Sequence, residues 1–315
     1  MDARTRIVAG VGLLACLLMA APSAPAVTAL KPVTGKLEVR IGIADQKASI
    51  FDDQRLRGLE LGYARRSVAW DALRDPRTAA ELDRWVAGAR AIGAEVLITF
   101  SRASGVKGRT PPSANAFLTQ FRRFRHRYPA VKAYAAWNEA NHCGTGTCKR
   151  PQLVARYFNA IRRNCPGCKV VAADLLDAPN MVGWVRAFRR AARFEPKYWG
   201  LHGYIDANRF QTTRTTRLLH AVKGEVWLTE VGGLVARRNG STIKLRQGKA
   251  HAAQATRFIF DRLARLSRRV TRIYLYHWSS SSSHDSWDSA LIGSDDRARP
   301  ALAVVERVLR QIRGD

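Results

Sequence analysis

The sequence predicts an α/β protein, a single (β/α)8 barrel, and three observations support this fold class. Apolar, β-branched runs alternate eight times with segments of helical spacing, which is typical of a parallel sheet built from βα units. Turn residues stand just before these runs, and longer polar segments follow them. The domain expected at 30–315 has roughly 285 residues, a length that suits one barrel.

Residues 1–29 are expected to form a signal peptide. A basic start is followed by an apolar run at 7–21 and by small residues at 24–26, the order that is typical of a secretory leader. Cys16 resembles a lipoprotein cysteine, but apolar residues follow it where a polar tether would be expected, which favours secretion over lipidation. The apolar run is too short to span a bilayer. The sequence therefore predicts a secreted protein, extracellular or associated with the cell wall, without a transmembrane segment.

The eight expected strands share a run of apolar and β-branched residues bounded by turn signals. In chain order they are 37–44, 63–70, 95–101, 131–139, 169–174, 198–204, 225–230 and 272–278.

Helical spacing is clearest before the fourth strand and at the end of the chain, where apolar side chains recur every three or four residues and predict one buried stripe each. The positions are Phe117, Phe121, Phe124 and Tyr128, and Leu302, Val305, Leu309 and Ile312.

Long polar segments follow four of the strands, at 101–113, 141–150, 232–248 and 279–299. Barrel active sites are built from the loops that follow the strands. We therefore expect substrate contacts to lie in these segments.

Four cysteines remain after the expected leader, an even number in an exported chain, where thiols oxidise. We expect disulfides between Cys143 and Cys148 and between Cys165 and Cys168, because each pair closes a small loop that contains glycine. Two other pairings are possible, and a four-cysteine zinc site is an alternative. The unequal gaps and the oxidising compartment argue against zinc, and no metal is expected.

The formal net charge of +28 points to anionic partners, such as nucleic acid, an anionic cell-wall polymer or an acidic polysaccharide. The arginines are scattered over several predicted helices and do not form one stripe. Solvated outer faces therefore explain the charge better than a specific nucleic-acid site does.

Two glutamates end apolar, strand-like runs: Glu139 in Trp-Asn-Glu-Ala-Asn and Glu230 in Trp-Leu-Thr-Glu-Val. These runs are the expected fourth and seventh strands, so a barrel would bring both carboxyls to one rim. Cleavage of a glycosidic bond needs one proton donor and one carboxylate that acts as nucleophile or base. A salt bridge to one of the many arginines is the alternative for either glutamate alone.

These motifs resemble the retaining glycoside hydrolases of clan GH-A, TIM-barrel enzymes whose fourth strand ends in Asn-Glu and whose seventh ends in a nucleophilic Glu. The resemblance implies that Glu139 is the general acid and base and that Glu230 is the nucleophile. We expect Glu139 to keep its proton near neutral pH through partial burial and the negative charge of Glu230. Ala140 stands where many members carry proline, which concerns the subfamily and not the reaction. Overall the chain resembles secreted barrels of high-GC actinobacteria.

The same resemblance implies two polar contacts near the glutamates. Asn138 matches the residue that hydrogen-bonds the sugar 2-hydroxyl, and Arg65 matches the second-strand arginine that helps to hold the nucleophile ionised. The neighbouring Arg66 leaves the register of that strand open by one residue. An ordinary loop asparagine and a surface arginine are the alternatives.

Further candidates lie on the sixth and last strands. His202 and Tyr204 are expected on one face of the sixth strand because side chains alternate there, and Tyr204 resembles the clan residue that hydrogen-bonds the nucleophile. Trp278, at the end of the last strand, resembles a sugar-stacking platform. The alternatives are packed or core side chains. Asp174 and Asp177 also reach the rim, but we interpret them as helix caps.

The sequence thus predicts a secreted retaining glycoside hydrolase that cleaves a β-linked glycan by double displacement, as a monomer and with no cofactor. Its partner would be a polysaccharide or oligosaccharide substrate. The alternative is a catalytically inactive barrel that binds anionic glycan or nucleic acid through its basic surface. A secreted nuclease would need an acidic metal-binding cluster or a pair of catalytic histidines, and the sequence offers neither motif.

Overall fold

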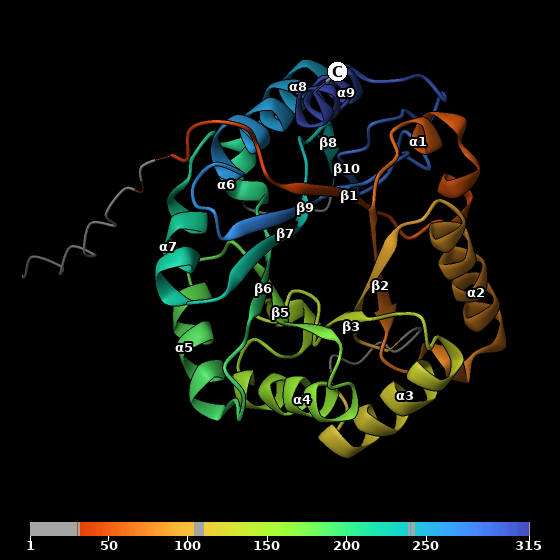
Figure 1. Ribbon diagram of the computed structural model, residues 1–315, viewed down its shortest axis with the longest axis vertical. Helices are drawn as coiled ribbons and strands as arrows, with labels where there is room; N and C mark the ends of the chain where they lie inside the picture. The colour runs from red at the N-terminus through yellow and green to blue at the C-terminus, as the bar shows by residue number, and fades with distance from the viewer. Residues whose placement is uncertain (1–29, 31, 104–109, 239, 241–242, 315) are drawn as a thin grey trace, which may run out of the picture.

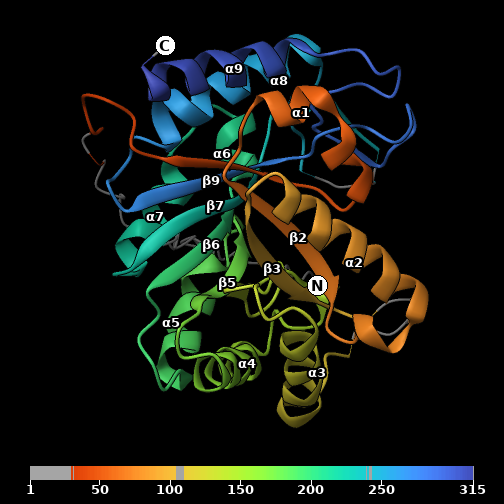
Figure 2. The ribbon, with the colours of Figure 1, turned by 45° about the vertical axis from the view of Figure 1, so that its right-hand side comes forward.

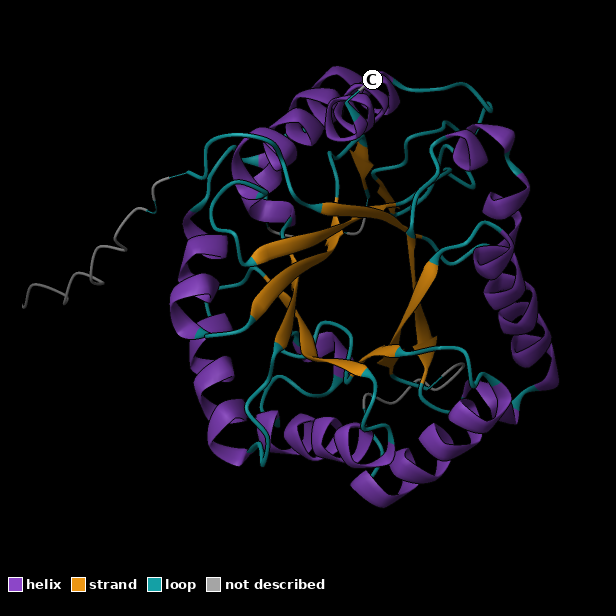
Figure 3. Cartoon of the chain, in the orientation of Figure 1, coloured by secondary structure: helices purple, strands orange, loops and turns teal. Residues whose placement is uncertain are grey.

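A computed structural model of the chain has eight parallel strands that close into a barrel in the order β1-β2-β3-β4-β5-β6-β7-β9. Helices surround the barrel on its outside, as Figures 1 and 3 show. The structure describes residues 30, 32–103, 110–238, 240 and 243–314. The predicted (β/α)8 fold is therefore confirmed, whereas the expected signal peptide and Cys16 lie outside the described residues.

Each predicted strand overlaps one strand of the barrel. Their bounds are β1 (Arg40–Ala44), β2 (Tyr63–Ala69), β3 (Glu95–Ser101), β4 (Ala133–Ala135), β5 (Lys169–Leu176), β6 (Tyr198–His202), β7 (Glu225–Val231) and β9 (Val270–Tyr276).

Three strand ends differ from the prediction in ways that affect the site. The fourth strand ends at Ala135, so Glu139 lies in the turn that follows it. The sixth strand ends at His202, and Tyr204 begins a short helix. The fifth strand continues to Leu176, so Asp174 belongs to the strand and is not a helix cap.

In the described chain the helices follow the barrel strands in sequence and surround the barrel on its outside. Their bounds are α1 (Gln54–Gly58), α2 (Pro76–Ala91), α3 (Ala114–Arg127), α4 (Pro151–Asn164), α5 (Met181–Ala191), α6 (Tyr204–Asn208), α7 (Thr213–Ala221), α8 (Lys249–Phe258) and α9 (Pro300–Arg313).

Local sequence signals explain where two of these helices begin and what they bury. Asp75 caps α2, and Ser113 caps α3 by accepting a hydrogen bond from the Ala116 backbone. The predicted aromatic stripe, which ends just after α3, is buried. At the other end of the chain α9 packs beside α8, as Figure 2 shows, and most of its predicted stripe is buried.

A small second sheet joins two loops above the barrel. Strands β8 (Ala236–Arg237) and β10 (Trp287–Asp288) pair antiparallel, with Trp287 opposite Arg237. This sheet was not predicted from the sequence. It holds the segments that follow β7 and β9 against each other on the rim where the site lies.

The barrel interior changes from apolar to polar along its axis. Its lower part is filled by a cluster that includes Ala135, Val171, Trp227 and Tyr274. The guanidinium of Arg272 lies 4.0 Å from the centre of the Trp227 ring and closes this end. Charged side chains occupy the opposite part, near the carboxyl ends of the strands.

Both predicted disulfides are present, Cys143–Cys148 and Cys165–Cys168. Within the described ranges, no group of three or more His, Cys, Asp or Glu side chains is arranged to hold a metal ion. No helix in the part of the chain that was searched is long and apolar enough to cross a membrane.

Candidate active site

Glu139 and Glu230 line the same cavity, which has a volume of about 1110 Å³. Residues at the carboxyl ends of the strands and in the loops beyond them form its walls. Glu139 Oε1 and Glu230 Oε2 lie 3.4 Å and 3.5 Å from one nitrogen, His202 Nδ1. The fold therefore brings together two carboxyls that are far apart in the sequence.

Arg65 lies beneath Glu230 and is completely buried. Its Nη1 donates to Glu230 Oε1 at 2.5 Å, and its Nη2 donates to Asp174 Oδ2 at 2.6 Å and to Asn138 Oδ1 at 2.8 Å. Arg66 points the other way, toward Glu81 on α2. The register left open by the sequence is thus resolved: Arg65 is the arginine of the site.

His202 lies between the two glutamates and Asp174, and its side chain is fully buried. Burial by itself would lower the pKa of this imidazole. The negative charges of Glu230, Asp174 and Glu139 outweigh that effect and raise its pKa to about 9. His202 is therefore protonated at neutral pH and partly neutralises the three carboxylates.

The pKa of Glu139 differs from the sequence-based expectation. Burial raises it, but hydrogen bonds from His142 and His202, together with their positive charge, outweigh burial and lower the pKa to about 2. We expected the carboxyl to keep its own proton because of burial and the charge of Glu230. In the free protein Glu139 is a carboxylate and the nearby proton resides on His202. The expectation is wrong because it did not include the histidines.

Tyr204 contacts Glu230 although it is not on the predicted strand. Its hydroxyl donates to Glu230 Oε2 at 3.3 Å from the first residue of α6. Burial and the charge of Glu230 raise the pKa of Tyr204 well above its usual value, so the hydroxyl keeps its proton. The two residues predicted on one strand face therefore do both reach the nucleophile candidate, but from different elements.

Trp278 is not an accessible stacking platform. It is only 1% exposed, and its Nε1 donates to Asp53 Oδ2 at 2.9 Å. The prediction for this residue is wrong because the strand ends two residues earlier and the chain then turns the ring into the core. Tyr276 and Trp287 line the cavity instead, and Trp287 packs edge-on against Tyr204.

Three acidic or basic contributors to the site were not predicted from the sequence. Asp174 bonds Arg65 and Thr99 inside the barrel, and Asp177 lines the cavity while it accepts the backbone amide hydrogens of Ile205 and Asp206. Burial raises the pKa of Asp177 to about 7. His142 contacts Glu139. A rim position was the available signal for both aspartates, and a histidine three residues after the acid was the signal for His142.

The fold and the site define the class: a (β/α)8 barrel with two carboxylates facing one cavity at the carboxyl ends of its strands. No family model matches the sequence, and no curated protein matches it. The solved structures that the barrel resembles include glycoside hydrolases. At these low identities the likeness shows the fold.

Three of these structures illustrate the likeness. A family 39 glycoside hydrolase from Bacteroides cellulosilyticus WH2 has a TM-score of 0.58 and 13% identity, over 86% of this chain and 63% of that one. A monomeric beta-xylosidase from Caulobacter crescentus CB15 has a TM-score of 0.61 and 12% identity, over 87% of this chain and 69% of that one. An endo-1,4-beta-xylanase from Caldicellulosiruptor owensensis has a TM-score of 0.61 and 11% identity, over 85% of this chain and 96% of that one. The chain thus spans less than two thirds of the family 39 enzyme.

Proposed function

We propose that this protein is a retaining glycoside hydrolase that cleaves a β-linked glycan, with Glu230 as nucleophile and Glu139 as general acid and base. The observation that carries the proposal is the contact of both carboxylates with His202 Nδ1 at the wall of one cavity. Glu139 Oε1 and Glu230 Oε2 lie 3.4 Å and 3.5 Å from this nitrogen, so these two oxygens cannot be farther apart than the sum of the two distances. This favours the spacing of retaining enzymes, about 5–5.5 Å, over most of the range of inverting enzymes, about 6.5–9.5 Å.

The first half of the reaction uses groups whose contacts are compatible with their roles. Glu230 attacks the anomeric carbon as a carboxylate that accepts hydrogen bonds from Arg65 and Tyr204. The leaving oxygen receives a proton through Glu139, which shares protons with His202 across 3.4 Å. One carbon–oxygen bond forms and one breaks, and the proton leaves with the alcohol.

The second half reverses these roles. Glu139, again a carboxylate, accepts a proton from water as the water attacks the anomeric carbon, and the Glu230 ester is released. Glu139 then returns this proton to His202. Both glutamates regain their original protonation states, and the proposed steps use only the substrate, water and side chains of the protein. Asn138 lies on the cavity wall beside Arg65, where its amide nitrogen can meet a sugar hydroxyl.

The experiment that tests this proposal is a screen of aryl and alkyl β-glycosides and β-glycans with four proteins: wild type, Glu139→Gln, Glu230→Gln and the control Glu306→Gln on α9. We expect Glu230→Gln to lose activity on every substrate. Glu139→Gln should lose about 10²- to 10⁴-fold on alkyl glycosides and much less on dinitrophenyl glycosides, whose leaving group needs no proton.

Two outcomes would contradict the assignment. Activity that survives in Glu230→Gln would remove it as nucleophile, and an inverted first-formed product anomer, read by proton NMR, would exclude double displacement. Secretion belongs to the same proposal, and the two disulfides support it because such bonds persist in oxidising compartments.

One observation favours a second candidate, a barrel that binds an anionic glycan or cell-wall polymer without cleaving it. Arg102 and Arg237 line the cavity together with the carboxylates, and the net charge is +28. This candidate predicts that binding survives in Glu139→Gln and Glu230→Gln while no substrate is cleaved by wild type.

A further inference from the structure

The turn after β4 carries a second histidine that faces the proposed acid. His142 Nδ1 lies 3.6 Å from Glu139 Oε2, and His202 Nδ1 lies 3.4 Å from Oε1, so one imidazole faces each carboxyl oxygen. The two histidines differ in their surroundings. The His202 side chain is completely buried, whereas the His142 side chain is 52% exposed. Packing therefore fixes His202 but contributes much less to the position of His142.

Hydrogen bonds fix the backbone that connects His142 to Glu139. Glu139 has a φ of 47°, a left-handed conformation that is strained for a residue with a side chain. Its carbonyl accepts from the His142 amide at 2.8 Å and from Thr145 Oγ1 at 3.0 Å. Thr147 Oγ1 donates to the Ala140 carbonyl at 2.7 Å. These bonds stabilise the turn conformation in which His142 faces the Glu139 carboxyl.

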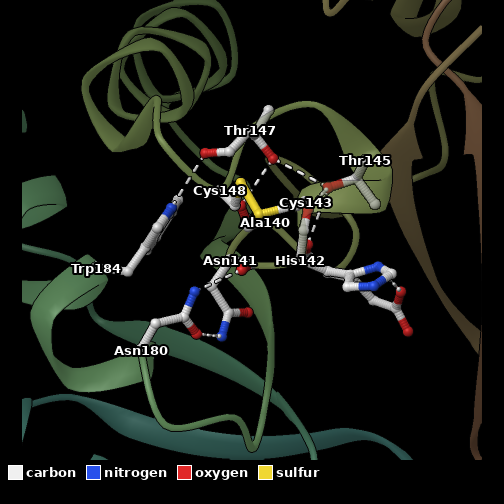
Figure 4. The surroundings of a disulfide bond; sticks show 10 residues. Ala140, Asn141, His142, Cys143, Thr145, Thr147, Cys148, Asn180 and Trp184 are labelled. Carbon is white, nitrogen blue, oxygen red and sulfur yellow. Dashed lines mark hydrogen bonds and ion pairs between the residues drawn. A yellow bond between two sulfur atoms is a disulfide. The ribbon is translucent and has the colours of Figure 1, made fainter. Parts of the chain in front are cut away.

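The Cys143–Cys148 disulfide closes this turn directly after His142. Figure 4 shows the bridge in the middle of the turn, with His142 and Trp184 on opposite sides. Trp184 Nε1 donates to the Thr147 carbonyl at 3.3 Å and so attaches the turn to α5. The bridge thus links the residue after His142 to the end of the turn, and the Trp184 contact links that end of the turn to α5.

Gly144 makes room for the His142 ring. A Cβ at position 144 would lie 2.7 Å from Cε1 and 2.9 Å from Nδ1 of His142, which is closer than real Cβ contacts. The ring thus rests on the bare backbone of the residue after Cys143. Gly167, in the other disulfide-closed turn, has open space where its Cβ would be. The two glycines provide a matched pair for experiment.

We propose that His142 is a positioning residue that holds Oε2 of Glu139 for proton transfer, and that the turn closed by Cys143–Cys148 holds His142 in place. The inference rests on the proposed function for its catalytic meaning. By hydrogen-bonding the carboxylate, His142 stabilises the conjugate base that forms when Glu139 gives up its proton. The other groups that face Glu139 are His202 directly and Tyr204, Glu230, Asp174 and Arg65 around that histidine.

The first test measures the ionisation of Glu139 without any turnover. Protein with ¹³C-labelled glutamate carboxyls is titrated by NMR, and the Glu139 signal is assigned by its loss in Glu139→Gln. We expect its midpoint to rise in His142→Leu and to remain near the wild-type value in His142→Asn, whose amide keeps a donor near the position of Nδ1. An unchanged midpoint in His142→Leu would overturn the inference even if the protein cleaves no glycoside.

Gly144→Ala displaces the ring without removing it. We expect the Glu139 midpoint to rise in Gly144→Ala, as in His142→Leu, and not to move in Gly167→Ala. Equal shifts in both alanine variants would show a general effect of altering a disulfide turn and would argue against the assigned contact.

The second test separates positioning from structure by the choice of leaving group. On an alkyl glycoside we expect His142→Leu to lower kcat/KM, which reports the step that releases the leaving group, about 10- to 100-fold, within the range of general acid catalysis. We expect little effect on kcat/KM for a dinitrophenyl glycoside. His220→Gln, at an exposed position on α7, is the control and should match wild type. An equal loss on both substrates would identify His142 as a structural residue only.

The disulfide is tested by two double variants. Cys143→Ser with Cys148→Ser should reproduce the leaving-group pattern of His142→Leu, and Cys165→Ser with Cys168→Ser should not. Wild-type kinetics in the first double variant would remove the bridge from the proposal, because the turn would then hold His142 without it.

Discussion

At the scale of single residues, Arg65 organises the charges of the site. Its buried guanidinium forms ion pairs with Glu230 at 2.5 Å and with Asp174 at 2.6 Å, and it donates a hydrogen bond to the Asn138 side-chain oxygen. Burial would raise the pKa of Asp174, but Arg65 and His202 lower it well below its usual range. Removing one partner from such a group leaves the others buried and uncompensated.

We predict that Arg65→Met destabilises the protein by about 3–5 kcal/mol, because two buried carboxylates would lose their partner. Urea unfolding measures this loss. The control is Arg127→Met, which removes an exposed ion pair with Asp83 and should change the stability far less, because solvent screens such a pair. Equal losses in the two variants would contradict the central role of Arg65.

His202 predicts a dependence of stability on pH. Its pKa is raised from the ordinary 6.5 to about 9 in the folded state, so its contribution is fully present below pH 6.5 and is lost as the pH rises through 9. The contribution is at most about 3 kcal/mol. The unfolding free energy of wild type minus that of His202→Gln should therefore shrink between pH 6 and pH 9. A constant difference across this range would show that His202 is not charged in the fold.

The sequence identified part of this network. Arg65, Asn138, Glu139, His202 and Glu230 meet at one place. The two glutamates were predicted from the apolar runs that they end, His202 from the face of the sixth strand, and Arg65 and Asn138 from the clan resemblance. Asp174 was missed because an aspartate at a strand end also fits a helix cap. The error at Trp278 has the same origin: a local pattern locates a strand end, but the direction of the chain beyond it depends on contacts with distant residues.

At the scale of elements, the site depends on how closely β5 and β6 approach. Gly200 on β6 pairs with Asp174 on β5, and a Cβ at 200 would overlap Asp174 Oδ1 and lie 2.8 Å from Thr229 Oγ1. The glycine thus leaves the space in which the Asp174 carboxylate meets Arg65. A sequence shows a glycine in a strand but not the side chain that occupies the space beside it.

We predict that Gly200→Ala displaces the Asp174 carboxylate, destabilises the fold by about 1–3 kcal/mol and lowers any glycosidase activity. Gly183→Ala is the control, because that position is exposed on α5 and a Cβ there meets nothing. It should leave activity unchanged and stabilise the helix by up to about 1 kcal/mol. Thermal unfolding and initial rates measure both effects. Wild-type behaviour of Gly200→Ala would show that Asp174 does not depend on this gap.

Loops and short elements were less predictable than the barrel strands. The pairing of β8 with β10 joins residues from two separate polar segments, and it brings Trp287 and Arg237 to the cavity. Each strand has only two residues, too short for an alternating pattern to reveal. Tyr204 likewise reached Glu230 from a helix where the sequence predicted a strand.

At the scale of the whole molecule, the charge of +28 gives a field that extends beyond the site. We predict that the double variant Glu139→Gln, Glu230→Gln binds polygalacturonate more tightly than neutral xylan at low salt, and that the difference disappears at high salt. The reason is that the screening length falls from about 10 Å at 0.1 M to about 3 Å at 1 M. Co-sedimentation measures the binding, and equal binding of the two polymers at low salt would contradict it.

The repeating βα units, the favoured disulfide pairs and the two candidate carboxylates could all be predicted from the sequence, because hydrophobic period, turn residues and short loop closures are local properties. The closed barrel was needed to show that Asp174 and His142 join Arg65 and His202 around those carboxylates. These four side chains surround the site from four different places in the chain. Their effect depends on distances of a few ångströms inside a low-dielectric interior, and such distances exist only once the barrel has closed.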